Sequence, residues 1–266
     1  MAILMILLSF IYPPPPSLYI TAMSVINFVA LTNAGFKETR GKNMNYSKFY
    51  NAGSSQNKAK ISSRKGMFVI YAPAFVAGLA SLWIFREEEF RFRLVSAVLT
   101  VHFFKRLLEV MCVHKYSGSV DVETTTVISL SYFTGTVNTL YAQHLSHEFP
   151  EPQIDLKTAG VVIFLIGITG NFYHHYLLSA LRSNNGEKQY KIPHGGLFSL
   201  VVCPHYLFEV LGFIGISCVS QTSYAFMFAL GTAFYLMGRS VSTRKWYLSK
   251  FENFPKDRKA MIPYLF

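Results

Sequence analysis

Stretches of about 20 mostly apolar residues recur along the chain and set its architecture. A helix needs about 20 such residues to cross a hydrocarbon core roughly 30 Å thick. Windows of this length with few charges occur at 17–35, 67–85, 93–113, 125–146, 158–181, 198–218 and 222–241. The pattern therefore predicts an all-α integral membrane protein, built as a bundle of about seven transmembrane helices.

The fourth window is the most polar, because it contains Thr124-Thr125-Thr126 and Asn138. We expect this helix to pack among the others rather than face lipid. The apolar stretch 1–12 lacks a basic n-region and a small-residue cleavage site, and it is interpreted as an uncleaved lead-in to the first span. The chain then divides into an N-terminal span with a cytosolic linker, 1–66, and a membrane domain, 67–266.

Composition supports the membrane assignment, since 51% of the residues are hydrophobic and only 15% are charged. The net charge of +11 would suit a nucleic-acid partner, but the basic residues are placed asymmetrically. Of 25 Lys and Arg residues, 19 fall in the segments 36–66, 114–124, 182–197 and 239–266. The opposite loops are acidic. This positive-inside pattern excludes a nucleic-acid role and predicts a cytosolic C-terminus.

Charged and polar residues also occur inside the predicted spans, at helical spacing. In the third span His102, Lys105, Arg106 and Glu109 stand at i, i+3, i+4 and i+7, so they share one helix face. Ionisable groups in the membrane are costly and normally face a bundle interior, a cavity or a partner. The stripe therefore indicates either an ion pair that locks the bundle or a functional site.

Three further helices repeat the pattern. Their polar residues are Asn171, His174, His175 and Arg182 in the fifth span, His205, Tyr206 and Glu209 in the sixth, and Tyr235, Arg239, Thr243, Trp246 and Tyr247 in the seventh. Together they predict a cation-lined cavity that is open to the cytosol, as a phosphate-bearing ligand requires. Its phosphate contacts are expected from Arg182, Lys191, Arg239 and Arg244.

Other kinds of functional site have less support in the sequence. A di-iron centre needs clustered histidine boxes, and the eight histidines offer only His144 with His147 and the pair His174-His175. A proton relay should cross the full membrane, whereas these stripes gather at one side. Three cysteines without C-x-x-C spacing suggest neither a disulfide framework nor zinc, and no G-x-G-x-x-G is present. No metal site is expected.

The run Tyr190-Lys191-Ile192-Pro193-His194-Gly195-Gly196-Leu197-Phe198 resembles the Y-x-I-P-x-G-G-L-F signature of steroid 5α-reductases, the 3-oxo-5-alpha-steroid 4-dehydrogenase family. The C-terminal segment 247–266 is similar as well. The resemblance is strongest over 158–266. It implies a seven-helix membrane oxidoreductase that uses NADPH to saturate a carbon–carbon double bond conjugated to a carbonyl in a lipid, in the endoplasmic reticulum.

The resemblance also implies site residues. The cofactor-binding positions carry over to Asn171, His175, Arg182, Tyr190, Lys191, His205, Arg239, Thr243 and Tyr247. At His175, His205 and Thr243 the residue differs from that of the steroid reductases, whereas Glu209 keeps the acid of the sixth helix. The positions that hold a steroid 3-keto oxygen are occupied by Tyr71 and Phe103, so the ketone would have to be held differently.

A second branch, the very-long-chain enoyl-CoA reductases, is similar at other points. Its H-x-x-K-R-x-x-E pattern matches the third-span stripe, and its proposed catalytic residues correspond to Lys105 and Tyr206. These enzymes carry an additional ubiquitin-like domain, for which this chain is expected to be too short, and they lack G-G-L-F. The expected substrate is a 3-oxo-Δ4 steroid, with a trans-2-enoyl-CoA or a polyprenol-type lipid as alternatives.

These observations give one mechanistic hypothesis and one rival. Hydride addition requires a donor to the carbonyl oxygen, for which we predict Tyr206 helped by Lys105, with Glu209 and His205 orienting the donors and Tyr71 as a second donor. The rival is a non-catalytic lipid-binding protein that has kept the fold. Protein partners are not indicated by the sequence.

Overall fold

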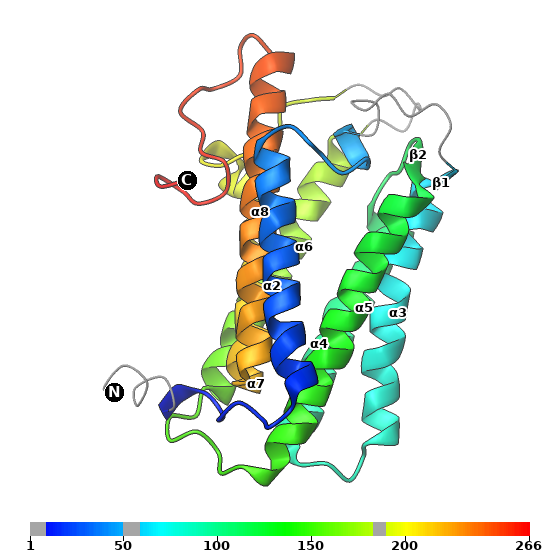
Figure 1. Ribbon diagram of the computed structural model, residues 1–266. Coiled ribbons are helices and arrows are strands. Elements are labelled where there is room, and N and C mark those ends of the chain that lie inside the picture. Colours follow the sequence, from blue (N-terminus) through cyan, green and yellow to red (C-terminus); the bar gives the residue numbers. More distant parts are fainter. Residues whose placement is uncertain (1–8, 50–58, 183–189) are drawn as a thin grey trace.

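The computed structural model describes residues 9–49, 59–182 and 190–266 (Figure 1). Parts of the predicted lead-in 1–12 and of the linker therefore lie outside the described residues. The α-helices in the described part are α2 (Leu18–Thr39), α3 (Ser63–Ile84), α4 (Phe90–Leu108), α5 (Val122–Leu145), α6 (Lys157–Ala180), α7 (Pro204–Ser220) and α8 (Ser223–Lys250). Short helical turns are η1 (Ser47–Phe49), the π-helix η2 (Glu109–Val113), η3 (Ser146–Glu148) and η4 (Gly196–Ser199).

The predicted helical class is confirmed, and each apolar window falls on one helix. Two boundaries differ. The sixth helix begins only at Pro204, whose fixed φ suits a first helical position, and the preceding residues form η4 and a loop. The last helix continues to Lys250, about nine residues past its window, because charged residues end an apolar pattern without ending a helix.

Three helices are long and apolar enough to cross a membrane: α2, α3 and α6. The apolar helix α7 is shorter, and α4, α5 and α8 carry more polar residues along their length. As predicted, α5 buries polar side chains, which include Thr125, Ser129, Thr136, Asn138 and Gln143. The number of seven crossings stays a prediction.

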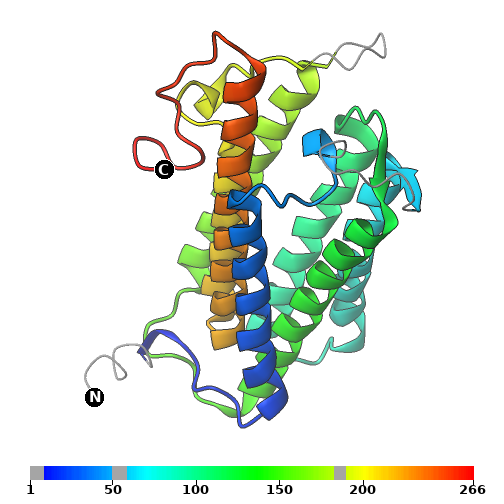
Figure 2. The same ribbon diagram turned by 45° about the horizontal axis from the view of Figure 1, so that its top comes forward.

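The helices form two groups that run side by side. Figure 2 shows α2, α6, α7 and α8 on one side and α3, α4 and α5 on the other. Buried apolar residues join the two groups, among them Leu99 and Phe103 of α4 and Phe213 of α7. The C-terminal segment and the antiparallel pair β1 (Lys60–Ser62) and β2 (Ser119–Asp121) lie at one end of the bundle (Figure 1).

Glycines allow two helix pairs to approach closely. A Cβ atom at Gly238 of α8 would lie 2.1 Å from the carbonyl oxygen of Gly35 in α2, and one at Gly167 of α6 would lie 2.4 Å from the Gly212 nitrogen of α7. Only glycine leaves room for such backbone contact, which is a common way of joining helices in membranes. The α2–α8 and α6–α7 seams therefore fix the first group.

The other end of the bundle is closed by Arg91, which is 2% exposed. Its Nη1 donates to the Val219 carbonyl and to Gln221 Oε1, each at 2.8 Å. Its Nε and Nη2 reach Glu151, at 3.3 and 3.2 Å, and Nη2 also reaches Asp155 at 3.1 Å. All three guanidinium nitrogens have partners, so this arginine ties α4 to the α5–α6 and α7–α8 connections.

Candidate active site

A cavity of about 540 Å³ lies between the two helix groups, at the end of the bundle that carries η1, β2 and the end of α8. Every helix from α3 to α8 contributes at least one lining residue, and η1 of the linker adds Lys48. The sequence predicted such a cavity from the third, fifth, sixth and seventh spans. The structure adds walls from α3 and α5, whose lining residues include Tyr71 and Tyr132.

The outer end of the cavity carries positive charge. Its lining cations are Lys48, Lys115, Arg182, Lys191 and Lys250. Three aromatic residues, Tyr190, Trp246 and Tyr247, lie among them. Lys48 Nζ sits 5.2 Å from the centre of the Trp246 ring and 4.6 Å from that of Tyr247, so the ammonium group packs on aromatic faces. Burial lowers the pKa of Lys48 to about 8.

The inner end is built from two tyrosines and a buried pair of opposite charges. Tyr71 of α3 and Tyr132 of α5 have ring centres 5.6 Å apart. Arg106 Nη2 donates to the Tyr71 hydroxyl, and the Tyr132 hydroxyl donates to Glu209 Oε1 at 3.3 Å. Arg106 and Glu209 are 7% and 5% exposed. Apolar side chains of Met67, Ile70, Ile128 and Leu236 complete the lining.

Behind this end, the third-span stripe forms an ion-pair network. Glu109 is fully buried and contacts Arg106 Nη1 at 2.6 Å, Lys105 Nζ at 3.0 Å and His175 Nδ1 at 3.0 Å. The predicted pairing of Lys105 with Glu109 is thus present, as part of a larger network. His102 is separate from it and packs between Phe103 and Phe213.

Lys105 reaches the catalytic candidate Tyr206 only indirectly. Its ammonium donates to the Asn171 side-chain oxygen, and Asn171 Nδ2 donates to the His205 carbonyl oxygen at 2.7 Å. These two hydrogen bonds connect Lys105 to the backbone just before Tyr206, and the help that Lys105 gives to Tyr206 stays a prediction. The Tyr206 ring itself lies 4.3 Å from the His205 ring, centre to centre.

The structure brings most of the predicted site residues to one place. Among the described residues the cavity lining includes Tyr71, His175, Arg182, Tyr190, Lys191, His205, Tyr206, Glu209, Thr243 and Tyr247. Lys105 and Asn171 lie behind the wall, as described above. Their individual roles stay predictions.

Arg239 differs from the expectation of a phosphate contact. Its Nη1 lies 2.8 and 2.9 Å from the two carboxylate oxygens of Glu38, and its guanidinium stacks 4.1 Å from the Tyr46 ring centre. Arg239 is 1% exposed. It therefore anchors the linker to α8. Arg244 likewise donates to the backbone carbonyls of Lys256 and Arg258.

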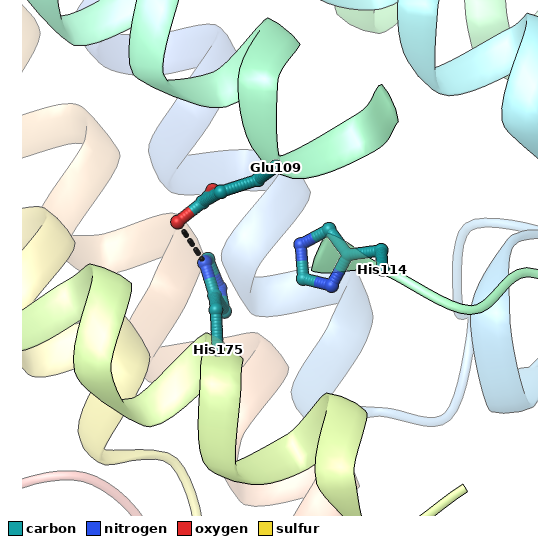
Figure 3. A group of neighbouring side chains, drawn as sticks. All are labelled: Glu109, His114 and His175. Carbon is teal, nitrogen blue, oxygen red and sulfur yellow. Dashed lines mark hydrogen bonds and ion pairs between the residues drawn. The ribbon is translucent and has the colours of Figure 1, made fainter. Parts of the chain in front are cut away.

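One group of side chains has the composition of a metal site. Glu109, His114 and His175 each offer a ligand atom, and these atoms lie within 4.8 Å of one another (Figure 3). Burial lowers the pKa of His114 to about 2, so its ring is neutral. The Glu109 carboxylate, however, already contacts Lys105 and Arg106, and two adjacent cations oppose a divalent ion. The geometry favours an ion-paired network.

Four further residues line the cavity and were not predicted from the sequence: Tyr46, Lys48, His114 and Tyr132. Tyr46 and Lys48 belong to the linker, where no periodicity marks a buried face. Tyr132 had one usable signal, because it is a large aromatic residue within an unusually polar span. His114 follows the third-span stripe by five residues and is brought back to it by the π-helix η2.

These features define a helical membrane protein with a cavity that is lined by charged and aromatic side chains. Comparison with known proteins identifies its family. Residues 121–266 match the family model described as 3-oxo-5-alpha-steroid 4-dehydrogenase. This match covers more than half of the chain. The protein belongs to the 3-oxo-5-alpha-steroid 4-dehydrogenase family.

Individual relatives fall into two groups. A steroid 5-alpha-reductase of Gossypium hirsutum is 42% identical over 109 residues, which are 41% of this chain and 42% of that protein. A very-long-chain enoyl-CoA reductase of Dictyostelium discoideum is 30% identical over 180 residues, 67% of this chain and 59% of its own length. A putative enoyl-CoA reductase of Trypanosoma brucei brucei is 32% identical over 203 residues, 73% and 64% of the two chains. The chain thus covers less than two thirds of each relative.

Proposed function

We propose that this protein is an NADPH-dependent oxidoreductase that reduces a carbon–carbon double bond conjugated to a carbonyl in a lipid. One observation carries the proposal: a single cavity joins an outer end of cations and aromatic rings to an inner end of tyrosine hydroxyls beside Arg106 and Glu209. The outer end suits phosphates and an adenine, and the inner end suits a carbonyl oxygen in an otherwise apolar chamber.

The residues present fit the cofactor. Arg182, Lys191 and Lys48 supply charge at the outer end, while Tyr190 and Tyr247 supply faces for stacking. Farther in, His205 Nδ1 is buried and has no hydrogen-bond partner among the residues that the structure describes, which is unusual for a polar atom inside a protein. A nicotinamide amide group is a suitable partner for it. His175 and Thr243 lie along the same wall.

The chemistry divides between the cofactor and the chain. When bound, NADPH would supply the hydride for the β-carbon and be oxidised to NADP⁺; the α-carbon would take a proton from solvent. The chain must stabilise the negative charge that develops on the oxygen. Tyrosine hydroxyls of the cavity provide the donors, and Tyr206 is the first of them by its motif. Lys105 acts as a positioning residue through Asn171.

The substrate class follows from the inner end and from the relatives. A 3-oxo-Δ4 steroid is our first candidate, because the family model is described as 3-oxo-5-alpha-steroid 4-dehydrogenase and the Gossypium hirsutum relative, at 42% identity, is named a steroid 5-alpha-reductase. An enoyl-CoA is the second candidate, since the enoyl-CoA reductases match a longer part of this chain, 67% and 73%. A polyprenol-type lipid is the third.

We place the protein in the endoplasmic reticulum membrane, with seven crossings and a cytosolic C-terminus. The charge bias supports this orientation, as does the position of β1, β2 and the C-terminal segment at the same end as the cavity mouth. NADPH would then enter from the cytosol.

The test is a substrate panel. Microsomes containing the protein are supplied with NADPH and a 3-oxo-Δ4 steroid, a trans-2-enoyl-CoA or a polyprenol-type compound, and the reduced products are measured. We expect one class to be reduced, and we expect Tyr206→Phe to lose most of this turnover while NADPH affinity stays within about twofold. Tyr264→Phe, a change at an exposed tyrosine, serves as the control. If purified protein neither binds NADPH nor reduces any of the three compounds, the proposal is wrong and the result favours a non-catalytic lipid-binding protein.

A further inference from the structure

The inner end of the cavity contains a hydroxyl that neither the motifs nor the comparisons assign to the site. Tyr132 comes from the middle of α5, and its ring lies between those of Tyr71 and Phe103, with centre-to-centre distances of 5.6 and 5.4 Å. It lines the cavity together with Tyr71, Arg106 and Glu209. Four different helices therefore deliver two hydroxyls, one cation and one carboxylate to the same place.

The hydrogen bonds of Tyr71 leave its proton available. The hydroxyl accepts from Arg106 Nη2, and in the described part of the chain it has no other hydrogen-bond partner. A tyrosine hydroxyl has one proton to donate besides its lone pairs. The Tyr71 proton can therefore be given to a ligand, and the adjacent guanidinium, 4.6 Å from the ring centre, favours negative charge on that ligand.

The hydrogen bond from Tyr132 to Glu209 is a weak one. Its bond to Glu209 is 3.3 Å long, whereas O–H···O bonds are usually about 2.7–2.8 Å. Glu209 has no ion pair or second hydrogen bond within the described residues, although Arg106 interacts with it electrostatically. A ligand oxygen that approaches Tyr71 can therefore replace Glu209 as the acceptor for Tyr132, while Arg106 still offsets the carboxylate charge.

We propose that Tyr132 and Tyr71 together hold the carbonyl oxygen of the substrate between two phenol hydroxyls, so that Tyr132 is a further catalytic residue. This inference rests on the proposed function. It explains how a carbonyl is bound by a chain that has Phe at position 103, because the hydroxyl is supplied by the ring packed against Phe103 from α5. It also makes a carbonyl, rather than an alcohol or a hydrocarbon end, the group recognised at this site.

The test removes one oxygen atom and reads both binding and turnover. Tyr132→Phe keeps the ring and its packing, and Tyr141→Phe on the same helix, where the tyrosine is 41% exposed and lies outside the cavity lining, is the matched control. Equilibrium binding to purified protein is measured for a 3-oxo-Δ4 steroid and for its 3-deoxy counterpart, and for a long-chain enone and the corresponding alkene. Turnover is measured in the same preparations.

For wild type and Tyr141→Phe we expect the ketone to bind at least tenfold more tightly than its carbonyl-free counterpart. In Tyr132→Phe this preference should fall by about tenfold, and kcat/KM should fall by about 10–100-fold with NADPH affinity unchanged. Equal carbonyl preference in Tyr132→Phe and wild type would overturn the assignment of Tyr132. If the wild type shows carbonyl preference but no turnover, the proposed function is contradicted, while carbonyl binding by Tyr71 and Tyr132 is not.

Discussion

Two arginines lie buried on α4, about 22 Å apart along the helix, and they are bonded in different ways. Arg91 uses all three guanidinium nitrogens on carbonyl, amide and carboxylate oxygens. Arg106 contacts Glu109, His175 and Tyr71, but its Nε has no hydrogen-bond partner in the described part of the chain. The fully bonded arginine closes the bundle. The incompletely bonded one borders the cavity.

The largest effect on stability is expected for Arg91→Leu, which removes the fully bonded arginine. Loss of the guanidinium leaves the buried Val219 carbonyl without its side-chain donor, and Gln221 Oε1 keeps only the N–H of Leu156. A buried acceptor left without its donor typically costs about 1–3 kcal/mol. We expect a large drop in the thermal unfolding midpoint in detergent. Arg86→Leu, at an exposed arginine of the same end, should behave as wild type; similar midpoints for the two variants would contradict the structural role of Arg91.

Arg106→Met should lower activity and leave stability largely unchanged, the opposite of Arg91→Leu. Glu109 keeps Lys105 and His175, so the protein should still fold, but Tyr71 loses the cation that favours charge on its ligand. We expect turnover to fall about 100-fold with little change in NADPH affinity. The measurement is kcat alongside cofactor binding, with Arg93→Met, an exposed position of α4, as control. Full activity in Arg106→Met would show that both arginines are structural.

A smaller effect is expected at the cavity mouth. Burial lowers the pKa of Lys48 to about 8, so the side chain carries its positive charge below that pH and loses the charge as the pH rises through it. NADPH affinity of the wild type should therefore weaken between about pH 7 and 9. Lys48→Gln should bind about fivefold more weakly at pH 7 and lose most of this pH dependence. Lys42→Gln, an exposed change in the same linker, should keep it; an unchanged pH profile in Lys48→Gln would remove Lys48 from the binding site.

The smallest effect concerns the carboxylates around Arg91. Hydrogen bonds from Arg91 and Lys157 lower the pKa of Glu151 below its ordinary value. Its contribution to stability is therefore present above the ordinary pKa and is lost as the pH falls through the lowered one. The Glu151 side chain is 47% exposed, so we expect less than about 1 kcal/mol. Glu151→Gln should lower the unfolding midpoint slightly at pH 7 and not at pH 3, whereas Glu148→Gln should change neither.

The local sequence pattern was sufficient to predict the positions of the helices and the faces that they turn toward the bundle interior. Apolar windows of membrane length identified the position of each helix, and the i, i+3, i+4 and i+7 spacing of His102, Lys105, Arg106 and Glu109 identified a buried face of α4 that continues into η2. The motif residues Glu209 and Tyr206 were found in the same way, since each lies on a short polar stretch within an apolar helix. In each case the information is contained within a few helical turns.

Long-range pairing was not predictable in this way. Glu38 lies just beyond the first apolar window, and nothing near it indicates that it meets Arg239 about 200 residues later. In the structure that pair occupies the Arg239 guanidinium, which also contacts Tyr46 of the linker. Tyr132 was missed for a related reason, because its value depends on Glu209 and Tyr71 from two other helices.

The α2–α8 seam also bears on biosynthesis. Gly35 and Gly238 must meet before Glu38 can pair with Arg239 and before Lys48 can reach the cavity mouth. At roughly 5–20 residues per second, α8 leaves the ribosome about 10–40 s after α2. During that interval Gly35 has no α8 backbone to pack against. The seam therefore forms late in synthesis, and we expect a substitution in it to reduce the amount of protein that matures rather than the turnover rate of each mature molecule.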